Sequence, residues 1–580
     1  MIHYKIEIAD VHAHLYRVTL TLPAPAAEQR LSLPVWIPGS YMVREFSRHL
    51  SGFSARQGRR EIDLQQLDKC SWLARCSGKA ALVLSYQVYA FDTSVRAAFL
   101  DAERGFFNGT GLCLRAEGRE AEAHQIELAG LPAGWQVASG MREIGKRRYE
   151  AADYDELVDH PFELGRFWRG RFEARGVAHE FVVAGALPSF DGERLLADSR
   201  RICEAQIDFW HAGASKPPFD RYVFLLNAVD DSYGGLEHRA STALIAARRD
   251  LPRLGQGEMN EGYARLLGLI SHEYFHTWNV KRLRPDVFAR FDYSQENYTE
   301  LLWFFEGFTS YYDDLFLVRA GLIDEARYLK LIAATFSGVL GVPGLHRMSV
   351  AQSSFEAWTK YYRQDENSPN AITSYYTKGS MIAMALDLTL RTAAKPRATL
   401  DSLMRALWQR SGGGGPVSEQ DILQTLAQLG GAEAAEKLAA WVHGTGELPL
   451  PQLLEQLGLQ WKSDKQTLAQ RLGLRVSDSG GSINVKQVLQ GSAAMAAGVC
   501  AGDEILASNG WRLKRLDDAA LTLGGERQPR LQLLVCRDQR MLTLEALLPE
   551  QGPCGLPVKL SAAEKSTPRA ARLRRDWLGG

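Results

Sequence analysis

The pattern of apolar and polar positions divides the chain into a strand-rich first part and a helical second part. Residues 4–22 and 82–91 alternate between apolar and polar side chains and are rich in β-branched and aromatic residues. This period of two predicts antiparallel strands with one buried face. Short segments of the same kind, separated by Gly, Pro and Asp, continue to about residue 185. We therefore expect an N-terminal antiparallel β-sandwich over residues 1–185.

From about residue 190 the period of the pattern becomes helical. An amphipathic helix is predicted first, then a buried strand at 221–229, and helical patterns dominate the later segments. The predicted helices cover residues 192–213, 323–340, 378–394 and 399–410. Strands followed by helices are typical of a thermolysin-like catalytic domain. We expect such a domain, mostly helical, at residues 186–460, and the chain as a whole to be a multidomain α+β protein.

Composition adds limits on location and partners. The 580 residues exceed what one core usually organises, and 46% hydrophobic with 23% charged residues is ordinary for a globular protein. The 68 basic and 68 acidic residues cancel, so charge gives no reason to expect binding to nucleic acid or to an anionic membrane. Neither a membrane-spanning run nor a leader pattern is visible. Seven cysteines without paired spacing favour reduced thiols, and we expect a cytoplasmic protein.

The strongest chemical signal is the pentad HEYFH at residues 272–276. Leu266 and Ile270 precede it at helical spacing, so the pentad is predicted on a helix with one buried face. His272 and His276 then lie one turn apart on a single face, as two zinc ligands require. Glu273 is placed to hold a metal-bound water. A chance HExxH is expected in roughly 2% of similar chains, and a surface helix with two histidines is the alternative interpretation.

A catalytic zinc ion needs a third protein ligand. The candidates are Glu296, Glu300 and Glu306. Glu306 stands among aromatic residues in LLWFFEGFTSYY, where a buried carboxylate would be costly unless it were paired or bound a metal. The other two glutamates are explained by a favourable position near a helix N-terminus. We assign Glu306 as the ligand, and both Asp313 and Ser310 stay open as hydrogen-bond partners of the histidines.

Three further segments have a predicted role. The aromatic loop at 33–50 is interpreted as a packed corner between strands, with the lining of a neighbouring site as the alternative. The sequence GSAAMAAGVCAGDEILASNG at 491–510 resembles a PDZ signature, and we place a PDZ domain at 461–555, in which RLGL at 471–474 could bind a peptide carboxylate. Residues 556–580 form a basic tail. We expect it to be solvated and partly disordered, with a recognition role as the alternative.

Five long motifs together resemble one peptidase family. They are WIPGSYMVREFSRHL, SYGGLEHRAST, HEYFHTWNVKRLRP, WFFEGFTSYYDD and SYYTKGSMIAMALDLTLR. They look like the glycyl aminopeptidase family that carries a PDZ domain, metallopeptidase family sixty-one, and the catalytic part also resembles the larger aminopeptidase-N group. The resemblance implies His272, His276 and Glu306 as ligands of one zinc ion per chain, and Glu273 as the general base.

The resemblance also implies residues that contact the substrate. Glu237, in GGLEH, matches the glutamate that binds the α-ammonium group of a substrate in the larger group. The backbone at Gly234 and Gly235 would lie beside an extended substrate, although a Gly-Gly pair is also an ordinary turn. Tyr376 matches the tyrosine that donates a hydrogen bond to the oxyanion, and Tyr375 is the alternative donor.

The basic run NVKRLRP follows the pentad directly. Lys281, Arg282 and Arg284 could reach a substrate carboxylate. We expect them instead to hold the loop between the two zinc-binding helices through salt bridges.

The leading hypothesis is a zinc aminopeptidase acting on peptides with a free N-terminus, with a preference for Gly or Ala implied by the family name. An endopeptidase is the second hypothesis, and it would gain if Glu237 lay far from the metal. A peptide-binding or chaperone-like protein with a structural metal is the third, but Glu273 and Tyr376 argue against it, because a structural site needs neither. A peptide C-terminus in the PDZ groove is a further expected partner, and we expect no nucleic acid or membrane partner.

Overall fold

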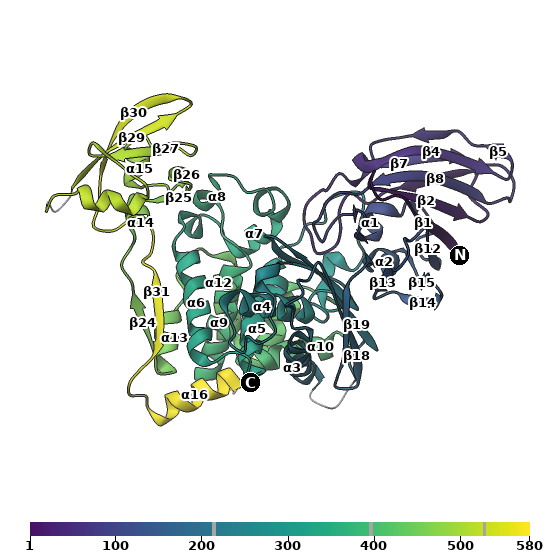
Figure 1. Cartoon of the computed structure of the whole chain (residues 1–580). Helices are drawn as coiled ribbons and strands as arrows, with labels where there is room; N and C mark the ends of the chain where they lie inside the picture. The colour runs from purple at the N-terminus through teal and green to yellow at the C-terminus, as the bar shows by residue number, and fades with distance from the viewer. Residues whose placement is uncertain (212–215, 394–397, 526–528, 580) are drawn as a thin grey trace. The chain divides into compact units, whose positions relative to one another are not determined.

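The computed structural model describes residues 1–211, 216–393, 398–525 and 529–579 (Figure 1). The chain forms two compact units. The first comprises Met1–Asn297 with Trp408–Val417, and the second comprises Tyr298–Leu407 with Ser418–Gly580. Strands dominate the beginning of the first unit and helices the beginning of the second. The multidomain α+β class is confirmed.

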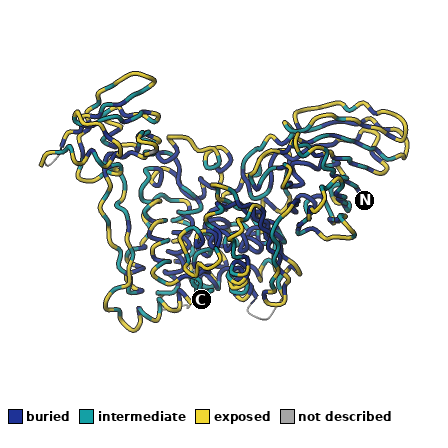
Figure 2. Tube along the Cα trace, viewed as in Figure 1, coloured by how far each residue is buried: buried dark blue, intermediate teal, exposed yellow. Residues whose placement is uncertain are grey.

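The N-terminal part of the first unit contains three sheets. The largest has eight strands in the order β14 (Arg142–Gly145), β15 (Arg148–Ala151), β12 (His124–Ala129), β1 (Ile2–Asp10), β2 (Leu15–Leu22), β8 (Leu82–Tyr89), β4 (Leu50–Gln57) and β5 (Arg60–Glu61). Buried and partly exposed residues alternate along β1 and β8 (Figure 2), as the period of two predicts. The pair β1–β12 is parallel, whereas β1–β2 and β2–β8 are antiparallel as expected.

Two four-stranded sheets accompany the large one. One runs β13 (Gln136–Ser139), β16 (Phe162–Gly165), β10 (Arg104–Phe107), β9 (Phe99–Leu100), and the other β11 (Arg115–Ala116), β3 (Glu28–Ser32), β7 (Ser71–Arg75), β6 (Leu64–Gln66). Apolar side chains from all three sheets join in one core, for example Tyr4, Leu31 and Phe162, each essentially unexposed. This shared core makes the N-terminal part a layered β domain.

The rest of the first unit is built on a five-stranded sheet, and this sheet positions the candidate site. Its order is β17 (Trp168–Ala174), β18 (Val177–Ala184), β19 (Arg221–Val229), β21 (Ser241–Ala247), β20 (Tyr233–Glu237). Strand β18 pairs in parallel with β19, so the two strands before residue 185 belong to this sheet. Helices α3 (Gly192–His211) and α4 (Glu261–Phe275) contact each other and the sheet, and β20 lies at its edge.

The second unit begins with helices. A π-helical turn, η4 (Trp303–Gly307), leads into α5 (Phe308–Arg319), and the later helices are α6 (Glu325–Leu340), α7 (Val350–Phe355), α9 (Thr377–Thr392), α11 (Glu419–Gly430), α12 (Ala432–His443) and α13 (Leu450–Gln456). Helix α10 (Leu400–Arg410) ends in the first unit. Helix α9 contacts α5, α12, α13 and the π-helical turn. It is therefore the central helix of this unit.

A small β domain with its own core follows the helices. Its sheet runs β25 (Leu474–Ser479), β26 (Ser482–Val488), β27 (Glu504–Ser508), β29 (Arg530–Arg537), β30 (Arg540–Leu547), with β28 (Trp511–Arg512) paired to β27. Leu472, Ile483 and Val535 are buried in its core. The chain enters and leaves this domain through the antiparallel pair β24 (Leu459–Ser463) and β31 (Val558–Ala562).

The C-terminal residues are ordered, contrary to the expected solvated tail. They form helix α16 (Pro568–Gly579), and Trp577 is fully buried. The indole nitrogen of Trp577 donates to the Tyr311 hydroxyl at 2.8 Å, and Arg391 donates to the carbonyl of Asp576 at 2.8 Å. The buried side chains of Trp577 and Leu578 and these two hydrogen bonds hold the helix on the second unit.

All seven cysteines are free thiols, as their spacing predicts. Among the residues that the structure describes, no helix combines the length and apolar character that a membrane span needs.

Candidate metal centre

Helix α4 carries the HEYFH pentad and is fixed at its first turn. The side chain of Asn260 accepts a hydrogen bond from the Tyr263 amide at 2.7 Å, so the first exposed amides of the helix are capped. Leu266 and Ile270 are buried, as their helical spacing predicts. The pentad thus occupies the last turn of a helix whose apolar face is anchored in the core.

The Nε2 atoms of the two histidines of the pentad face one another. The Nε2 atoms of His272 and His276 are 3.0 Å apart. The other ring nitrogen of His276, Nδ1, lies 2.7 Å from the carbonyl oxygen of Asn279, which orients the ring and leaves Nε2 directed at the site. Two imidazoles bound to one tetrahedral zinc ion at about 2.0–2.1 Å would hold their nitrogens about 3.3 Å apart. The observed separation fits such a pair of ligands.

The hydrogen-bond partner of His276 Nδ1 is the main-chain carbonyl of Asn279. A main-chain partner cannot be identified from residue types in the sequence. Ser310 and Asp313 lie on α5 in the second unit. Their pairing with the histidines stays a prediction.

Glu273 is buried and lies against strand β20. A Cβ atom built on Gly235 would come within 2.1 Å of Glu273 Oε1. Gly235 therefore has a steric reason to be glycine, because any side chain would collide with this carboxylate. Gly234 has no such constraint, since its nearest neighbours would be 3.9 Å away. The Gly-Gly pair lies in a strand, so the alternative of an ordinary turn is wrong.

Glu237 ends strand β20 on the same face as Gly235, two residues along. Its carboxylate is buried, and one ligand atom from each of Glu237, Glu273 and His276 lies within 4.8 Å of the others. The first unit thus brings the expected amine anchor, the expected base and one expected zinc ligand together. Glu237 is not remote from the pentad.

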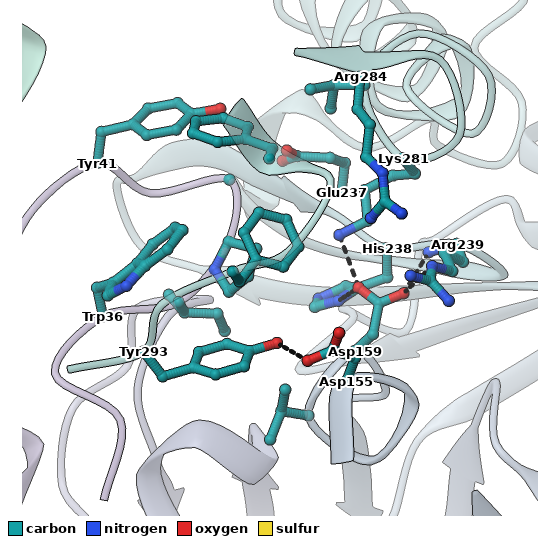
Figure 3. A pocket seen from close by; sticks show the side chains of 17 residues that line it. Trp36, Tyr41, Asp155, Asp159, Glu237, His238, Arg239, Lys281, Arg284 and Tyr293 are labelled. Atoms are coloured by element: carbon teal, nitrogen blue, oxygen red, sulfur yellow. Dashed lines mark hydrogen bonds and ion pairs between the residues drawn. The ribbon is translucent and has the colours of Figure 1, made fainter. Parts of the chain in front are cut away.

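The aromatic loop at 33–50 contacts this cluster. Gly39 has a φ of +93°, and a Cβ atom built on it would lie 2.6 Å from both carboxylate oxygens of Glu237. Trp36, Tyr41 and Glu237 line one pocket (Figure 3). Trp36 and Tyr41 are also buried. The loop is therefore both a packed corner and a wall of the site, so neither interpretation excludes the other.

A buried ion pair between Asp159 and Lys281 lies next to the site. The Asp159 carboxylate lies 2.6 Å from Lys281 Nζ and 3.4 Å from His238 Nδ1, and it accepts from the Arg239 amide at 2.9 Å (Figure 3). Burial alone would raise the pKa of Asp159, but Lys281, with His238 and Arg239, holds that pKa well below its usual value. Asp159 thus ties the segment after the pentad to the residue that follows Glu237.

The other two basic residues of the run make different contacts. Arg282 donates to the main-chain carbonyls of Thr277, Arg239 and Pro218. Arg284 lines the pocket of Figure 3. Only Lys281 of the three forms a salt bridge among those the structure describes. No sequence signal marks Asp159, because an acid in LVDHPF has no special spacing.

Glu306 lies in the second unit on the π-helical turn and is 2% exposed. Trp303, Phe304 and Phe305 precede it and are fully buried. π-helical turns inside helices occur frequently at functional sites. The burial of this acid among aromatic rings is the situation that the sequence predicts.

Two glycines bring Glu306 to the start of α9. A Cβ atom on Gly307 would lie 2.6 Å from the Cα of Gly379, and one on Gly379 would lie 2.9 Å from the Cα of Gly307. The π-helical turn and α9 therefore touch through their backbones. This contact gives the glycines of EGF and TKG a shared structural role.

The two tyrosines before α9 differ in exposure. Tyr375 is fully buried, whereas Tyr376 keeps partial exposure. Burial, followed by the charge of Glu306, raises the pKa of Tyr376 well above its usual value. Tyr376 therefore stays a neutral hydroxyl near Glu306, and its side chain is less buried than that of Tyr375.

Comparisons with known proteins identify the family of the chain. Family models match for the peptidase M61 N-terminal domain at 3–166, the M61 glycyl aminopeptidase at 265–382 and the PDZ domain at 460–535. A solved structure of an aminopeptidase N family protein from Idiomarina loihiensis is 36% identical, with each chain covered completely and a TM-score of 0.93. An M1 zinc metallopeptidase from Deinococcus radiodurans is 16% identical over 78% of this chain and 94% of its own, with a TM-score of 0.47. The comparison with curated proteins found no match.

A histidine pair and a neighbouring glutamate lie on one helix beside the edge strand of a sheet, and the matched family model supports a metallo-aminopeptidase. The chain belongs to the M61 glycyl aminopeptidase family and carries a PDZ domain. The resemblance drawn from the five motifs is confirmed.

Proposed function

We propose that this protein is a zinc aminopeptidase that removes the N-terminal residue from peptides with a free amine. His272, His276 and Glu306 would hold one zinc ion per chain. The support is the donor set: two imidazole nitrogens already directed at a common point, and a carboxylate buried among aromatic rings. Two histidines and a glutamate are a known catalytic zinc set that leaves one position open.

The zinc ion, when bound, would supply an acidified water and polarise the scissile carbonyl. Glu273 would accept a proton from the attacking water and return it to the leaving amine. Tyr376 donates a hydrogen bond to the developing oxyanion, and one such donor is typically worth about 3 kcal/mol. Tyr375, fully buried, has no surface to offer to a substrate.

The observation that carries an aminopeptidase over an endopeptidase is the short distance from Glu237 to the base. Glu237, Glu273 and His276 have ligand atoms within 4.8 Å of one another. In a substrate, the α-nitrogen and the first carbonyl carbon are separated by two bonds, about 2.5 Å. If Glu237 binds the α-ammonium group, only one residue therefore fits between that group and the scissile peptide bond next to Glu273.

The pocket beside Glu237 supports a preference for small residues. Its cavity measures about 20 Å³, close to the space of one water. Gly39 lines it from the loop, and even a Cβ atom there would lie 2.6 Å from the Glu237 carboxylate oxygens. The hydrogen of glycine or the methyl group of alanine fits this space, and the side chain of leucine does not. The preference for Gly and Ala follows if this pocket receives the first side chain.

The test uses arylamides of glycine, alanine and leucine together with their N-acetylated forms. We expect hydrolysis of the free-amine glycine and alanine substrates only, loss of activity with a chelator, and its return with zinc. Glu273→Ala should abolish hydrolysis. Glu237→Gln should raise KM and lower kcat/KM by about 10- to 100-fold, because it removes a charge-assisted hydrogen bond.

Glu258→Gln is the matched control, because Glu258 is exposed in a loop before α4. It should leave kcat/KM unchanged. Equal cleavage of acetylated substrates would overturn the aminopeptidase assignment and favour the endopeptidase. Purified protein without bound zinc that regains no activity on adding zinc would overturn the proposed chemistry as a whole.

The PDZ domain offers a second peptide site. Strand β25 is an edge strand of its sheet, and an edge strand can pair with an added peptide strand. The RLGL segment before it is not a loop, contrary to expectation, because Arg471 and Leu472 end a short helix and Leu474 begins the strand. Arg471 donates to the Pro549 carbonyl at 2.7 Å, and a Cβ atom on Gly473 would lie 3.2 Å from Pro553. A fluorescent peptide with a free C-terminus should bind the protein and its C-terminal amide should not; equal binding would refute carboxylate recognition.

A further inference from the structure

A second cavity, in the second unit, surrounds a buried lysine. It has a volume of about 360 Å³, within the range of small-molecule pockets, which is about 300–1,000 Å³. Its walls come from α6, α9, α13, β24 and the 3₁₀ turn η5 (Pro343–His346). Most of its lining is apolar, including Leu345, Met381, Leu450 and Trp461. The Trp461 ring stacks on Phe336 at 5.1 Å, so this wall is held in place.

Lys378 is the one buried cation in this lining. It is 1% exposed, and its ammonium has a single long contact of 3.5 Å to the Leu345 carbonyl. No carboxylate of the described residues lies within 4.0 Å of it. The other buried lysine of the described residues, Lys281, lies 2.6 Å from the Asp159 carboxylate. A lysine ammonium carries three donors, and burying it without a counter-charge is costly.

The chemistry of the cavity selects the kind of ligand. Burial lowers the pKa of Lys378 to about 8, so an anion brought to the cavity at neutral pH would find a mostly protonated amine and would stabilise its charge further. Glu447 at the exposed rim contributes a negative charge. One cation inside and one acid at the rim favour a ligand with a single negative charge over a polyanion such as a phosphate.

We propose that this cavity binds a small apolar molecule that ends in one carboxylate. The carboxylate accepts from Lys378, and the apolar part lies along Met381, Leu450 and Trp461. A short fatty acid and the apolar acid end of a peptide fragment share this chemistry. The site is distinct from the metal centre and does not depend on the proposed function.

The experiment measures binding by calorimetry on the full-length protein. Octanoate is the probe, octan-1-ol and octylammonium are the matched uncharged and cationic chains, and N-acetyl-leucyl-leucine represents the peptide source. We expect octanoate to bind at least 10-fold more tightly than octan-1-ol, and octylammonium not to bind. Tighter binding of N-acetyl-leucyl-leucine than of octanoate would identify the peptide source, and the reverse would identify the fatty acid. Equal affinity for octanoate and octan-1-ol would overturn the proposal.

Two variants distinguish binding through the Lys378 ammonium group from nonspecific binding of an apolar chain. Lys378→Met should weaken octanoate binding by about 10- to 100-fold, the cost of a lost hydrogen bond to a charged group, with little change for octan-1-ol. Lys462→Met is the control, since Lys462 is exposed next to Trp461 on β24, and its affinity should match that of the wild type. Unchanged octanoate binding in Lys378→Met would refute the site.

Because Lys378 lies inside a central helix, a variant with lower risk to folding is included. Leu448 lines the cavity with partial exposure, so Leu448→Glu adds a negative charge near the mouth without disturbing the core. We expect octanoate to bind at least 10-fold more weakly to this variant, and less so at high salt. An unchanged affinity would contradict the proposal even if Lys378→Met failed to fold.

Discussion

Gly235→Ala provides the sharpest test of the metal centre, because it adds one methyl group and moves one carboxylate. A Cβ atom at Gly235 would lie 2.1 Å from Oε1, 2.3 Å from Cδ and 2.6 Å from Cγ of Glu273. Contacts below 3.0 Å are essentially never seen, so the Glu273 side chain must move by about 1 Å. The neighbouring Gly234 would meet nothing closer than 3.9 Å.

The magnitude follows from the proposed role of Glu273 as the base. A displacement of about 1 Å at a catalytic group can cost about 100-fold in rate, which corresponds to about 2.7 kcal/mol of transition-state stabilisation. Alanine in a strand is no worse than glycine for stability. We therefore expect kcat of Gly235→Ala to fall about 100-fold while its melting temperature stays close to that of the wild type.

The assay is steady-state hydrolysis of an alanine arylamide, with Gly234→Ala as the matched control. Loss of a transition-state group lowers kcat and leaves KM nearly unchanged, so the two parameters must be measured separately. Gly234→Ala should retain activity within about twofold. Equal activity of the two variants would refute the argument that Gly235 fixes the position of Glu273.

Three further predictions concern residues around the site and the end of the chain. Gly39→Ala should displace Glu237, whose oxygens would lie 2.6 Å from the new methyl group, and raise KM for free-amine substrates; an unchanged KM would contradict this contact. Asp159→Asn breaks a buried pair and should cost about 3–5 kcal/mol at pH 7. Since the folded pKa of Asp159 is lowered, this stability is present above pH about 3.8 and is lost as the pH falls toward the lowered value, so denaturant unfolding should show the full deficit at pH 7 and a smaller one as the pH is lowered below about 3.8. Trp577→Ala should destabilise the second unit by about 3–5 kcal/mol, whereas a melting curve like that of the wild type would show that α16 is dispensable.

Local patterns predict much of this protein because many of its determinants are local. The alternation at 4–22 reflects strands with one buried face, and the spacing of Leu266 and Ile270 reflects one helix packed on the core. The histidines and Glu273 could be found for the same reason, since one helical turn fixes their spacing. Each of these features depends on neighbours within a few residues.

Features that depend on distant parts of the chain could not be predicted in this way. Asp159 forms an ion pair with Lys281, which is more than a hundred residues away in the sequence. No pattern in the sequence around Asp159 predicts this pair. The C-terminal segment looked solvated because it is basic, but Trp577 is buried and bonded to Tyr311, and Arg391 donates to the carbonyl of Asp576. Lys378 lies in a helical pattern where a lysine usually faces solvent. In all three cases the deciding contact comes from another element.

Close packing gives several glycines of the quoted motifs a structural reason of their own. A Cβ atom on Gly39 would collide with the carboxylate of Glu237, one on Gly235 with that of Glu273, and one on Gly307 with the backbone of Gly379. A side chain at any of these glycines would push an acid or its supporting backbone out of place. The glycines in PGS, GGLE and EGF are therefore as constrained as the glutamates, although they take no part in proton transfer or metal binding. An alanine scan of these positions should lower activity without unfolding the protein at Gly235, where only a side chain must yield. At Gly307 and Gly379 it should lower stability as well, because backbone meets backbone there.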